Sequence, residues 1–426
     1  MKYAYTNGYI LTGEEDMTPI AGQTVLTDGE LITAIEPDTA DLAGYQVVDL
    51  KKQYLMPGLI NLHVHLPASG KPKKKPTDNA KLVRLITSTA LTRRILMKMC
   101  AGYAKTELFS GVTTMRTVGG VLDSEAKIRD LILSGKLPGP RILAANMAIS
   151  VPGGHMAGSL AYEAHSAQEA RDFVHKIADG KPDLIKLMIT GGVLDAKVKG
   201  EPGELKMAPE LVKAACEEAH ALGLPVAAHV ESPEGVRVAL SNGVDTIEHG
   251  AQADAEIISL FKERNACLVS TISPALPYAL FDREVSYASE LEQYNGNVVF
   301  EGILACAKAC MENDIPVGLG TDTGCPFMTH DCMWREVYNF HKFCGVSNAY
   351  ALYTAAKRNA ELVGLGNVTG SIAPGKCADM IVSRENPLED LTTLRNLSMV
   401  ISRGKLYDAP KVKKMANVER ELDKFL

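Results

Sequence analysis

Between residues 57 and about 366, short apolar runs alternate with longer amphipathic stretches, and the alternation occurs eight times. Each apolar run has the length of a buried strand, and each amphipathic stretch that of a covering helix. The runs lie at 59–65, 113–118, 141–145, 184–189, 226–229, 246–249, 267–271 and 317–321. Repeated strand–helix units build a parallel sheet, and eight units can close into a barrel. We therefore predict an α/β fold whose main domain is a (β/α)8 TIM barrel.

The two ends of the chain lack this alternation. Residues 1–56 carry short β-like segments separated by turns, and Asp28-Gly29 between two of them is typical of a tight hairpin. Further strand patterns occur at 370–382 and 399–405. We expect both ends to combine into one small β-sandwich domain. The predicted boundaries are 1–56 with 367–426 for the sandwich, and 57–366 for the catalytic barrel.

The composition is that of an ordinary globular protein of 426 residues, with 46% hydrophobic residues, 23% charged residues and a net charge of -6. These values give no attraction to nucleic acid or membranes, and the one basic cluster, residues 71–76, reads as a solvated loop. No signal peptide or membrane-spanning stretch is recognised. The nine cysteines are scattered and lack a Cys-x-x-Cys pair, which argues against a disulfide framework. We expect a cytoplasmic protein.

Polar residues occupy the ends of several predicted barrel strands. Barrel enzymes carry their chemistry at the carboxyl ends of the strands, so these positions are expected to meet in one site. Each residue alone has an ordinary structural explanation, but a joint occurrence favours metal binding. The candidate ligands are His63 and His65 on the first strand, Lys186 on the fourth, His229 on the fifth, His249 on the sixth and Asp322 after the eighth.

Lys186 needs a separate argument, because a protonated lysine is repelled by metal ions. Burial near cations lowers the pKa of an amine, and a neutral amine can react with carbon dioxide to form an anionic carbamate that bridges two metals. Nitrogen and oxygen ligands without thiolate favour zinc, with manganese, iron or cobalt as other candidates. A carboxylated Lys186 and a hydroxide would lie between two metal sites: His63, His65 and Asp322 on one, and His229 and His249 on the other.

Together these residues resemble the amidohydrolase superfamily over nearly the whole chain. The His-x-His pair follows Pro-Gly-Leu-Ile, and the lysine, two later histidines and aspartate come in the expected order. Further motifs are similar to the imidazolonepropionase and Xaa-Pro dipeptidase (prolidase-like) branch: 111–114, 153–155, 185–193, 227–229 and 246–250. The resemblance implies a histidine at position 155 that contacts the substrate. Barrel enzymes of this kind are often symmetric oligomers, so we expect a homo-oligomer.

The expected reaction is metal-dependent hydrolysis of a carbon–nitrogen bond in a small dipeptide-like, N-acyl or cyclic amide. The metals would lower the pKa of a bridging water to roughly 7 and polarise the carbonyl. Asp322 would hold the hydroxide, accept its proton and return it to the leaving nitrogen. His155 would stabilise the developing oxyanion.

Several positions depart from the family pattern. Asn61 and Thr117 stand where many members carry aspartate, and both changes lie next to expected ligands or substrate residues. Glu231 stands where dipeptidase relatives tend to carry a tyrosine that meets the substrate carboxylate. If Glu231 faces the site, it favours a substrate with a cation or N–H donor; it could equally point to solvent. Arg116 is a further candidate for shaping the substrate pocket.

Two other functions are compatible with the sequence. A deaminase or cyclic amidine or imidazolone-type hydrolase attacks a C=N carbon, often with a single metal and a proton-shuttling glutamate, a role that Glu231 could fill. Such enzymes generally lack a carboxylated lysine on the fourth strand. A non-catalytic barrel homologue is the second alternative, although such relatives typically lose metal ligands and all six positions are filled here.

Overall fold

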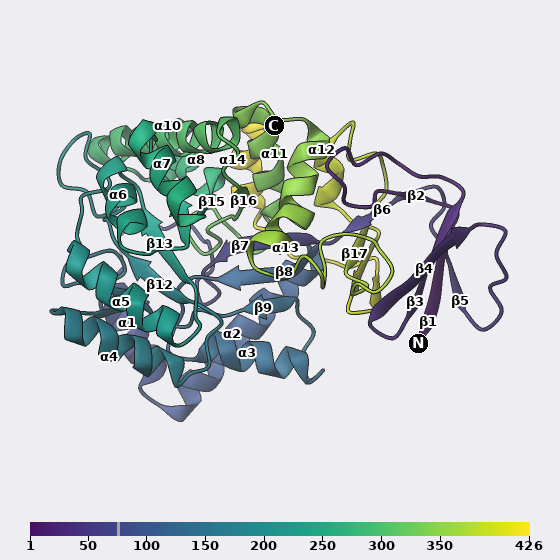
Figure 1. Cartoon of the computed structure of the whole chain (residues 1–426), viewed down its shortest axis with the longest axis horizontal. Coiled ribbons are helices and arrows are strands. Elements are labelled where there is room, and N and C mark those ends of the chain that lie inside the picture. Colours follow the sequence, from purple (N-terminus) through teal and green to yellow (C-terminus); the bar gives the residue numbers. More distant parts are fainter. Residues whose placement is uncertain (75–76) are drawn as a thin grey trace.

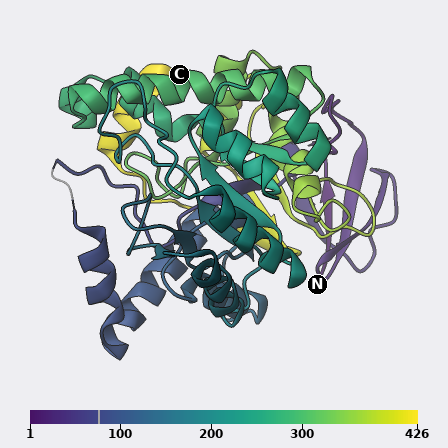
Figure 2. The same cartoon turned by 60° about the vertical axis from the view of Figure 1, so that its left-hand side comes forward.

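The computed structural model describes residues 1–74 and 77–426, and it consists of a barrel with a smaller β-sandwich at one side (Figure 1). A view from a second direction again places the N-terminal strands, drawn in purple, beside the barrel (Figure 2). Lys75 and Pro76, from the basic cluster of the sequence, lie outside the described residues. Within the part of the chain that is described, no helix has the length and apolar character needed to cross a membrane.

Eight strands form the barrel, as the alternating pattern predicts. They are β7 (Leu59–Val64), β8 (Val112–Thr117), β9 (Arg141–Leu143), β12 (Ile185–Met188), β13 (Val226–Val230), β14 (Thr246–His249), β15 (Cys267–Ser270) and β16 (Val317–Leu319). Strands β7 to β9 pair in parallel, as do β12 to β16, and a short strand β10 (Ala148–Ser150) pairs with β12. The observed limits differ from the predicted runs by at most two residues, because buried parallel strands are continuous apolar runs.

The barrel closes where β16 returns to β7. A parallel bridge joins Val64 to Thr323, and the Asn359 side chain donates hydrogen bonds to the carbonyls of Ile60 and Leu319, at 2.7 and 2.9 Å. One buried amide thus links the first and last barrel strands. The predicted TIM barrel is confirmed.

Helices cover the outside of the barrel and connect its strands. Their starts follow the capping signals in the sequence; Ser166, for example, accepts a hydrogen bond from the Glu169 amide at 3.2 Å. The helices are α1 (Asn79–Thr87), α2 (Ala90–Phe109), α3 (Ser124–Leu133), α4 (Ala167–Ala178), α5 (Pro209–Ala221), α6 (Pro233–Ser241), α7 (Ala255–Arg264), α8 (Ile272–Leu280), α9 (Arg283–Ser286), α10 (Glu290–Glu312), α11 (Met333–Cys344), α12 (Asn348–Tyr353) and α13 (Asn359–Leu362).

Both chain ends contribute strands to the β-sandwich, as expected. One sheet has the order β4-β3-β1-β5 and the other β19-β18-β17-β6-β2. Apolar side chains from the two sheets form one core, which includes Tyr5, Val25, Leu55, Met380 and Ile401. The strands are β1 (Lys2–Thr6), β2 (Tyr9–Ile10), β3 (Gln23–Asp28), β4 (Leu31–Pro37), β5 (Gln46–Asp49), β6 (Tyr54–Pro57), β17 (Met380–Ser383), β18 (Met399–Ser402) and β19 (Lys405–Asp408).

The C-terminal helix differs from the sequence prediction. Helix α14 (Ala416–Leu422) was expected in the sandwich domain, but it packs on the barrel, where Val418 and Leu422 join the main core. Glu419 of this helix receives hydrogen bonds from Arg335 at 3.1 Å and Arg395 at 2.6 Å. The predicted domain boundary therefore needs this correction, because the apolar side chains of the helix belong to the main core and not to the core of the sandwich.

Candidate metal centre

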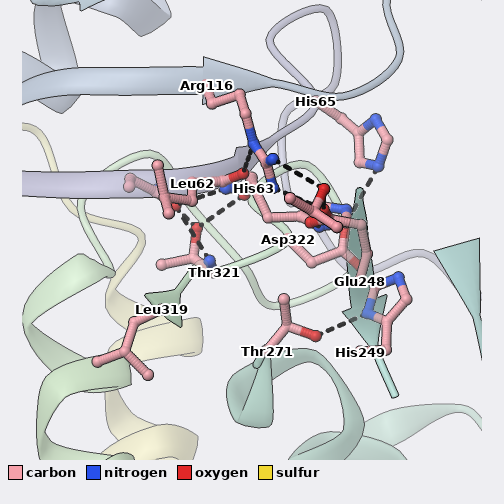
Figure 3. Close-up of polar contacts among 12 residues, drawn as sticks. Leu62, His63, His65, Arg116, Glu248, His249, Thr271, Leu319, Thr321 and Asp322 are labelled. Atoms are coloured by element: carbon pink, nitrogen blue, oxygen red, sulfur yellow. Dashed lines mark hydrogen bonds and ion pairs between the residues drawn. The ribbon is translucent and has the colours of Figure 1, made fainter. Parts of the chain in front are cut away.

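His63 and His65 lie side by side at the carboxyl end of β7 (Figure 3). Side chains alternate along a strand, so residues two apart share a face, and the two ring centroids are 5.4 Å apart. Each ring uses Nδ1 for a protein partner: Glu248 Oε2 at 2.8 Å from His63, and the Gly119 carbonyl at 2.9 Å from His65. The Nε2 atoms approach Asp322 Oδ1 at 3.5 and 3.2 Å. The two free nitrogens therefore converge on one carboxylate.

His249, at the end of β14, and Asp322, just after β16, complete this group. Both have left-handed backbone conformations, with φ of 69° and 52°, which only a small fraction of non-glycine residues adopt. His249 Nδ1 lies 2.7 Å from Thr271 Oγ1. One ligand atom each from His63, His249 and Asp322 lies within 4.8 Å of the others. The strained strand ends thus bring together ligands from the first, sixth and eighth barrel strands.

His229 and Glu231 form a second group with His249. Their ligand atoms also lie within 4.8 Å of one another. Glu231 Oε2 is buried, and it has no hydrogen-bond partner among the described residues. Burial and the negative charges of Asp322 and Asp195 raise the pKa of Glu231 to about 8. The Glu231 carboxylate therefore lies beside His229 and His249 and does not point to solvent.

Lys186 is fully buried on β12, and its Nζ has no hydrogen-bond partner within residues 1–74 and 77–426. Burial lowers its pKa to about 8, opposed by the charge of Glu248 and assisted by that of Arg116. A buried amine without a partner is costly, so this atom is expected to gain one in the functional protein. A carboxylated amine would supply oxygen atoms at this position.

Three of the four histidines have lowered pKa values, which fits metal binding. Burial, together with the charge of Lys186, lowers the pKa of His63 to about 4. Burial likewise holds the pKa of His229 and of His249 well below the ordinary value, whereas the contact with Asp322 outweighs burial and raises the pKa of His65. Neutral imidazoles are the form that binds metal. With the buried carboxylate of Asp322, the donor set is the nitrogen and oxygen set that suits a divalent ion such as zinc.

Glu248 lies beneath the site and was missed by the sequence interpretation. Its Oε2 contacts His63 Nδ1, and its Oε1 accepts a hydrogen bond from Arg116 at 2.6 Å. Burial opposes the ionisation of Glu248, but Arg116 and His63 hold its pKa well below the usual range. Strict strand alternation would put Glu248 and His249 on opposite faces; the left-handed His249 backbone lets both point inward. Such carboxylate–histidine contacts fix the ring and raise its basicity.

Arg116 has a different place from the one predicted. It was expected to shape the substrate pocket, but it is buried inside the barrel, where it donates to the Leu62 carbonyl at 2.8 Å and to Thr246 Oγ1 at 3.1 Å as well as to Glu248. These contacts occupy its guanidinium. Arg116 therefore holds Glu248 in position.

His155 reaches the site from the loop between β10 and β11 (Ala161–Glu163). Its ring stacks on His229, with centroids 4.1 Å apart and planes 7° from parallel. Its Nδ1 lies 2.5 Å from Asp195 Oδ2. The structure thus brings every predicted ligand, and also His155 and Glu231, to one end of the barrel.

Comparison with known proteins gives the family. The sequence profile of the Amidohydrolase family matches residues 54–407. The chain belongs to the amidohydrolase family. A prolidase-like protein from Bifidobacterium longum has a TM-score of 0.87 at 34% identity, covering 99% of this chain and 98% of that one. A Xaa-Pro dipeptidase with bound methionine has a TM-score of 0.83 at 28% identity, covering 96% and 100%. Ochratoxinase from Aspergillus niger is 26% identical over 385 residues, covering 84% of this chain and 76% of its own.

This amidohydrolase is accordingly an enzyme, a hydrolase acting on carbon–nitrogen bonds. The recognition of the superfamily is confirmed, and the prolidase-like branch is consistent with these relatives. The alternative of a non-catalytic barrel is wrong.

Two of the three departures of this amidohydrolase from the family pattern, Asn61 and Thr117, make buried hydrogen bonds. Asn61 accepts a hydrogen bond from the Thr321 amide at 3.1 Å and donates to Thr321 Oγ1 at 2.8 Å, which fixes the backbone just before Asp322. Thr117 donates to the buried carboxylate of Glu125 at 2.6 Å. Both residues therefore support the site through neighbours.

Proposed function

We propose that this amidohydrolase uses two divalent metal ions, with zinc favoured, to hydrolyse the amide bond of a small dipeptide-like, N-acyl or cyclic amide substrate. His63, His65 and Asp322 would hold one ion. His229 and His249 would hold the other, with carboxylated Lys186 between them. The observation that carries the proposal is the buried Lys186 Nζ, which has no hydrogen-bond partner among the described residues, at a site that also holds four histidines and the Asp322 carboxylate.

The chemistry divides between the metals and the protein. When bound, the metals lower the pKa of the attacking water and polarise the scissile carbonyl. Asp322 accepts the proton that this water loses and delivers it to the leaving nitrogen. Burial opposes its ionisation, but His63 and His65 hold its pKa well below the usual range, so it is an ionised base at neutral pH. His155 lies beside His229, where it can contact the carbonyl oxygen.

The test of this function is metal content measured together with the state of Lys186. Purified protein, analysed by elemental mass spectrometry, is expected to hold two metal ions per chain. Protein reconstituted with zinc and ¹³C-labelled bicarbonate is expected to show a carbamate signal by ¹³C NMR. The same preparation should hydrolyse members of a panel of dipeptides and N-acyl amino acids. An unmodified Lys186 in fully loaded protein would refute the carbamate bridge.

A deaminase or cyclic amidine hydrolase is a second candidate, which the position of Glu231 favours. Its unpartnered Oε2 faces the site, and its raised pKa of about 8 suits a group that gains and loses a proton near neutrality. Metal content and the state of Lys186 distinguish the two candidate functions. One metal per chain and a free Lys186 amine support a deaminase or cyclic amidine hydrolase, whereas two metals and a carbamate refute it.

The position of Glu231 also leads to a prediction about substrate specificity. Above its pKa of about 8, the Glu231 carboxylate is ionised, and it then repels an acidic leaving group and favours a substrate with a cation or N–H donor, because like charges in a desolvated site are costly. Replacing it, Glu231→Tyr, is expected at about pH 9 to raise kcat/KM for substrates with a free carboxylate by about tenfold, relative to their amides. Glu231→Gln serves as the control, since it removes the ionisable group without adding a phenol. An unchanged preference across the panel would place Glu231 outside the substrate space.

A further inference from the structure

A carboxylate from a neighbouring loop contacts His155. The loop after β12 carries Gly192 and Asp195, and Asp195 Oδ2 lies 2.5 Å from His155 Nδ1. The same oxygen accepts a hydrogen bond from the Gly192 amide at 3.0 Å. Burial opposes ionisation of Asp195, but His155 and the Gly192 amide lower its pKa. One ionised oxygen therefore joins the histidine ring to the backbone of a loop that is itself part of the site.

The orientation of the His155 ring depends on this contact. The side chain is 20% exposed, and that of Asp195 is 32% exposed, so close packing on all sides does not fix either one. One face of the ring stacks on His229. Stacking fixes the plane of the imidazole ring, but the ring can still turn within that plane. Stacking alone therefore does not determine which ring nitrogen faces the site. The hydrogen bond to Asp195 determines it.

Gly192 lies against both His155 and Glu231. A Cβ built at this glycine would lie 3.4 Å from His155 Nδ1 and Cε1, and 3.4 Å from Glu231 Oε2. These are van der Waals distances, so both side chains pack beside this glycine. Gly192 thus sets His155 and Glu231 around one point, with Asp195 behind the ring.

We propose that Asp195 is a positioning residue for His155: it holds the proton on Nδ1, and so leaves Nε2 as the ring nitrogen presented to the substrate. The inference rests on the proposed function of the site for its effect on catalysis, but not for the contact itself. A carboxylate that orients a working histidine in this way fixes both the ring and its tautomer. The sequence gives little sign of this role, because Asp195 and His155 are 40 residues apart in two loops.

The first test requires neither metal nor substrate. Protein labelled with ¹⁵N in histidine is freed of metal, and His155→Ala assigns the signals of His155. In the parent protein, Nδ1 of this ring is expected to carry a proton. In Asp195→Ala, the neutral ring should shift toward the tautomer protonated on Nε2, which is the one that free imidazole side chains prefer. An unchanged Nδ1 signal in Asp195→Ala would overturn the proposal.

The second test is a double-mutant cycle on whichever panel substrate is hydrolysed fastest. Asp195→Ala is expected to lower kcat by about 10- to 100-fold, the usual cost of a misplaced group, with metal content and Tm unchanged. The double variant Asp195→Ala/His155→Ala should be no worse than His155→Ala alone. Additive losses would show that Asp195 acts independently of His155 and refute the proposal. Glu204→Ala, which removes an exposed carboxylate from the same loop, is the matched control.

These tests separate failure of the inference from failure of the proposed function. If the parent protein hydrolyses no amide in the panel but the ¹⁵N signals change as expected, the Asp195 contact stands and the substrate assignment fails. If amides are hydrolysed and the ring signal is insensitive to Asp195, the function stands and the inference fails.

Discussion

Replacing Asp322 by asparagine is expected to lower kcat by about 10²- to 10⁴-fold, the range typical of losing a general acid–base group. Asparagine has the same shape, but it cannot accept a proton from water or return one to the leaving nitrogen. The native carboxylate oxygen lies 3.2 and 3.5 Å from the two histidine nitrogens of β7, so the substitution changes the group at the centre of the site. The measurement is kcat at saturating substrate, with zinc in excess.

In Asp322→Asn, a loss of activity through weaker metal binding must be distinguished from a loss through the missing base. Asparagine is also a weaker ligand, so metal content of the Asp322→Asn protein is determined after the assay. Asp331→Asn is the matched control, because Asp331 is likewise buried, in the same connection between β16 and α11. It is expected to keep its activity. Asp322→Asn protein with full metal content and nearly unchanged kcat would contradict the assigned role.

The framework of the site could be predicted from the sequence because it rests on local patterns. Apolar runs identify the barrel strands, and barrel geometry brings the ends of the strands together. His63, His229 and Asp322 are therefore placed correctly relative to one another before any coordinates are known. The roles of the ligands, by contrast, remain predictions, because burial and distance fit metal binding without identifying the ion.

The supporting residues could not be predicted, since their roles depend on contacts between distant parts of the chain. Arg116 and Glu248 meet across 132 residues, and neither has a local signal that distinguishes it from a salt bridge at the surface. The inward orientation of Glu248 is also hard to predict, because the left-handed backbone of His249 breaks the alternation of side chains that assigns strand residues to a face. Residues 416–422 were assigned to the wrong domain for a related reason, because no local pattern shows against which core they pack.

Replacing Lys186 by methionine is expected to abolish the shared metal centre. The expected loss in kcat/KM is about 10³-fold or more, because the metal centre stabilises the transition state by several kcal/mol. Methionine has nearly the volume of lysine and no charge. Because the native amine is fully buried without a hydrogen-bond partner among the described residues, the apolar substitute should leave the Tm of the metal-free protein unchanged or raise it. Loss of activity in a protein of undiminished stability would locate the effect in the site.

A second variant tests whether a carboxylate-like group is what the site needs. Lys186→Ala opens a space into which acetate or propionate can bring two oxygens, and these acids should restore part of the metal content and activity. They should not do so in Lys186→Met, where the space is filled. Leu187→Met, a volume-conserving change at the next residue of β12, is the control. A Lys186→Met protein with two metals and full activity would show that the amine is dispensable.

The pKa of Lys186 adds a pH dependence to this prediction. Carbamate forms from the neutral amine, and with a pKa of about 8 only about a tenth of the amines are neutral at pH 7. At fixed dissolved carbon dioxide, the rate at which metal-free protein regains activity with zinc should therefore rise about tenfold per pH unit below pH 8 and level off above it. The profile should vanish in Lys186→Ala rescued by acetate, whose carboxylate is ionised throughout. A rate independent of pH in the parent protein would mean that the amine does not have to lose its proton, which the carbamate mechanism requires.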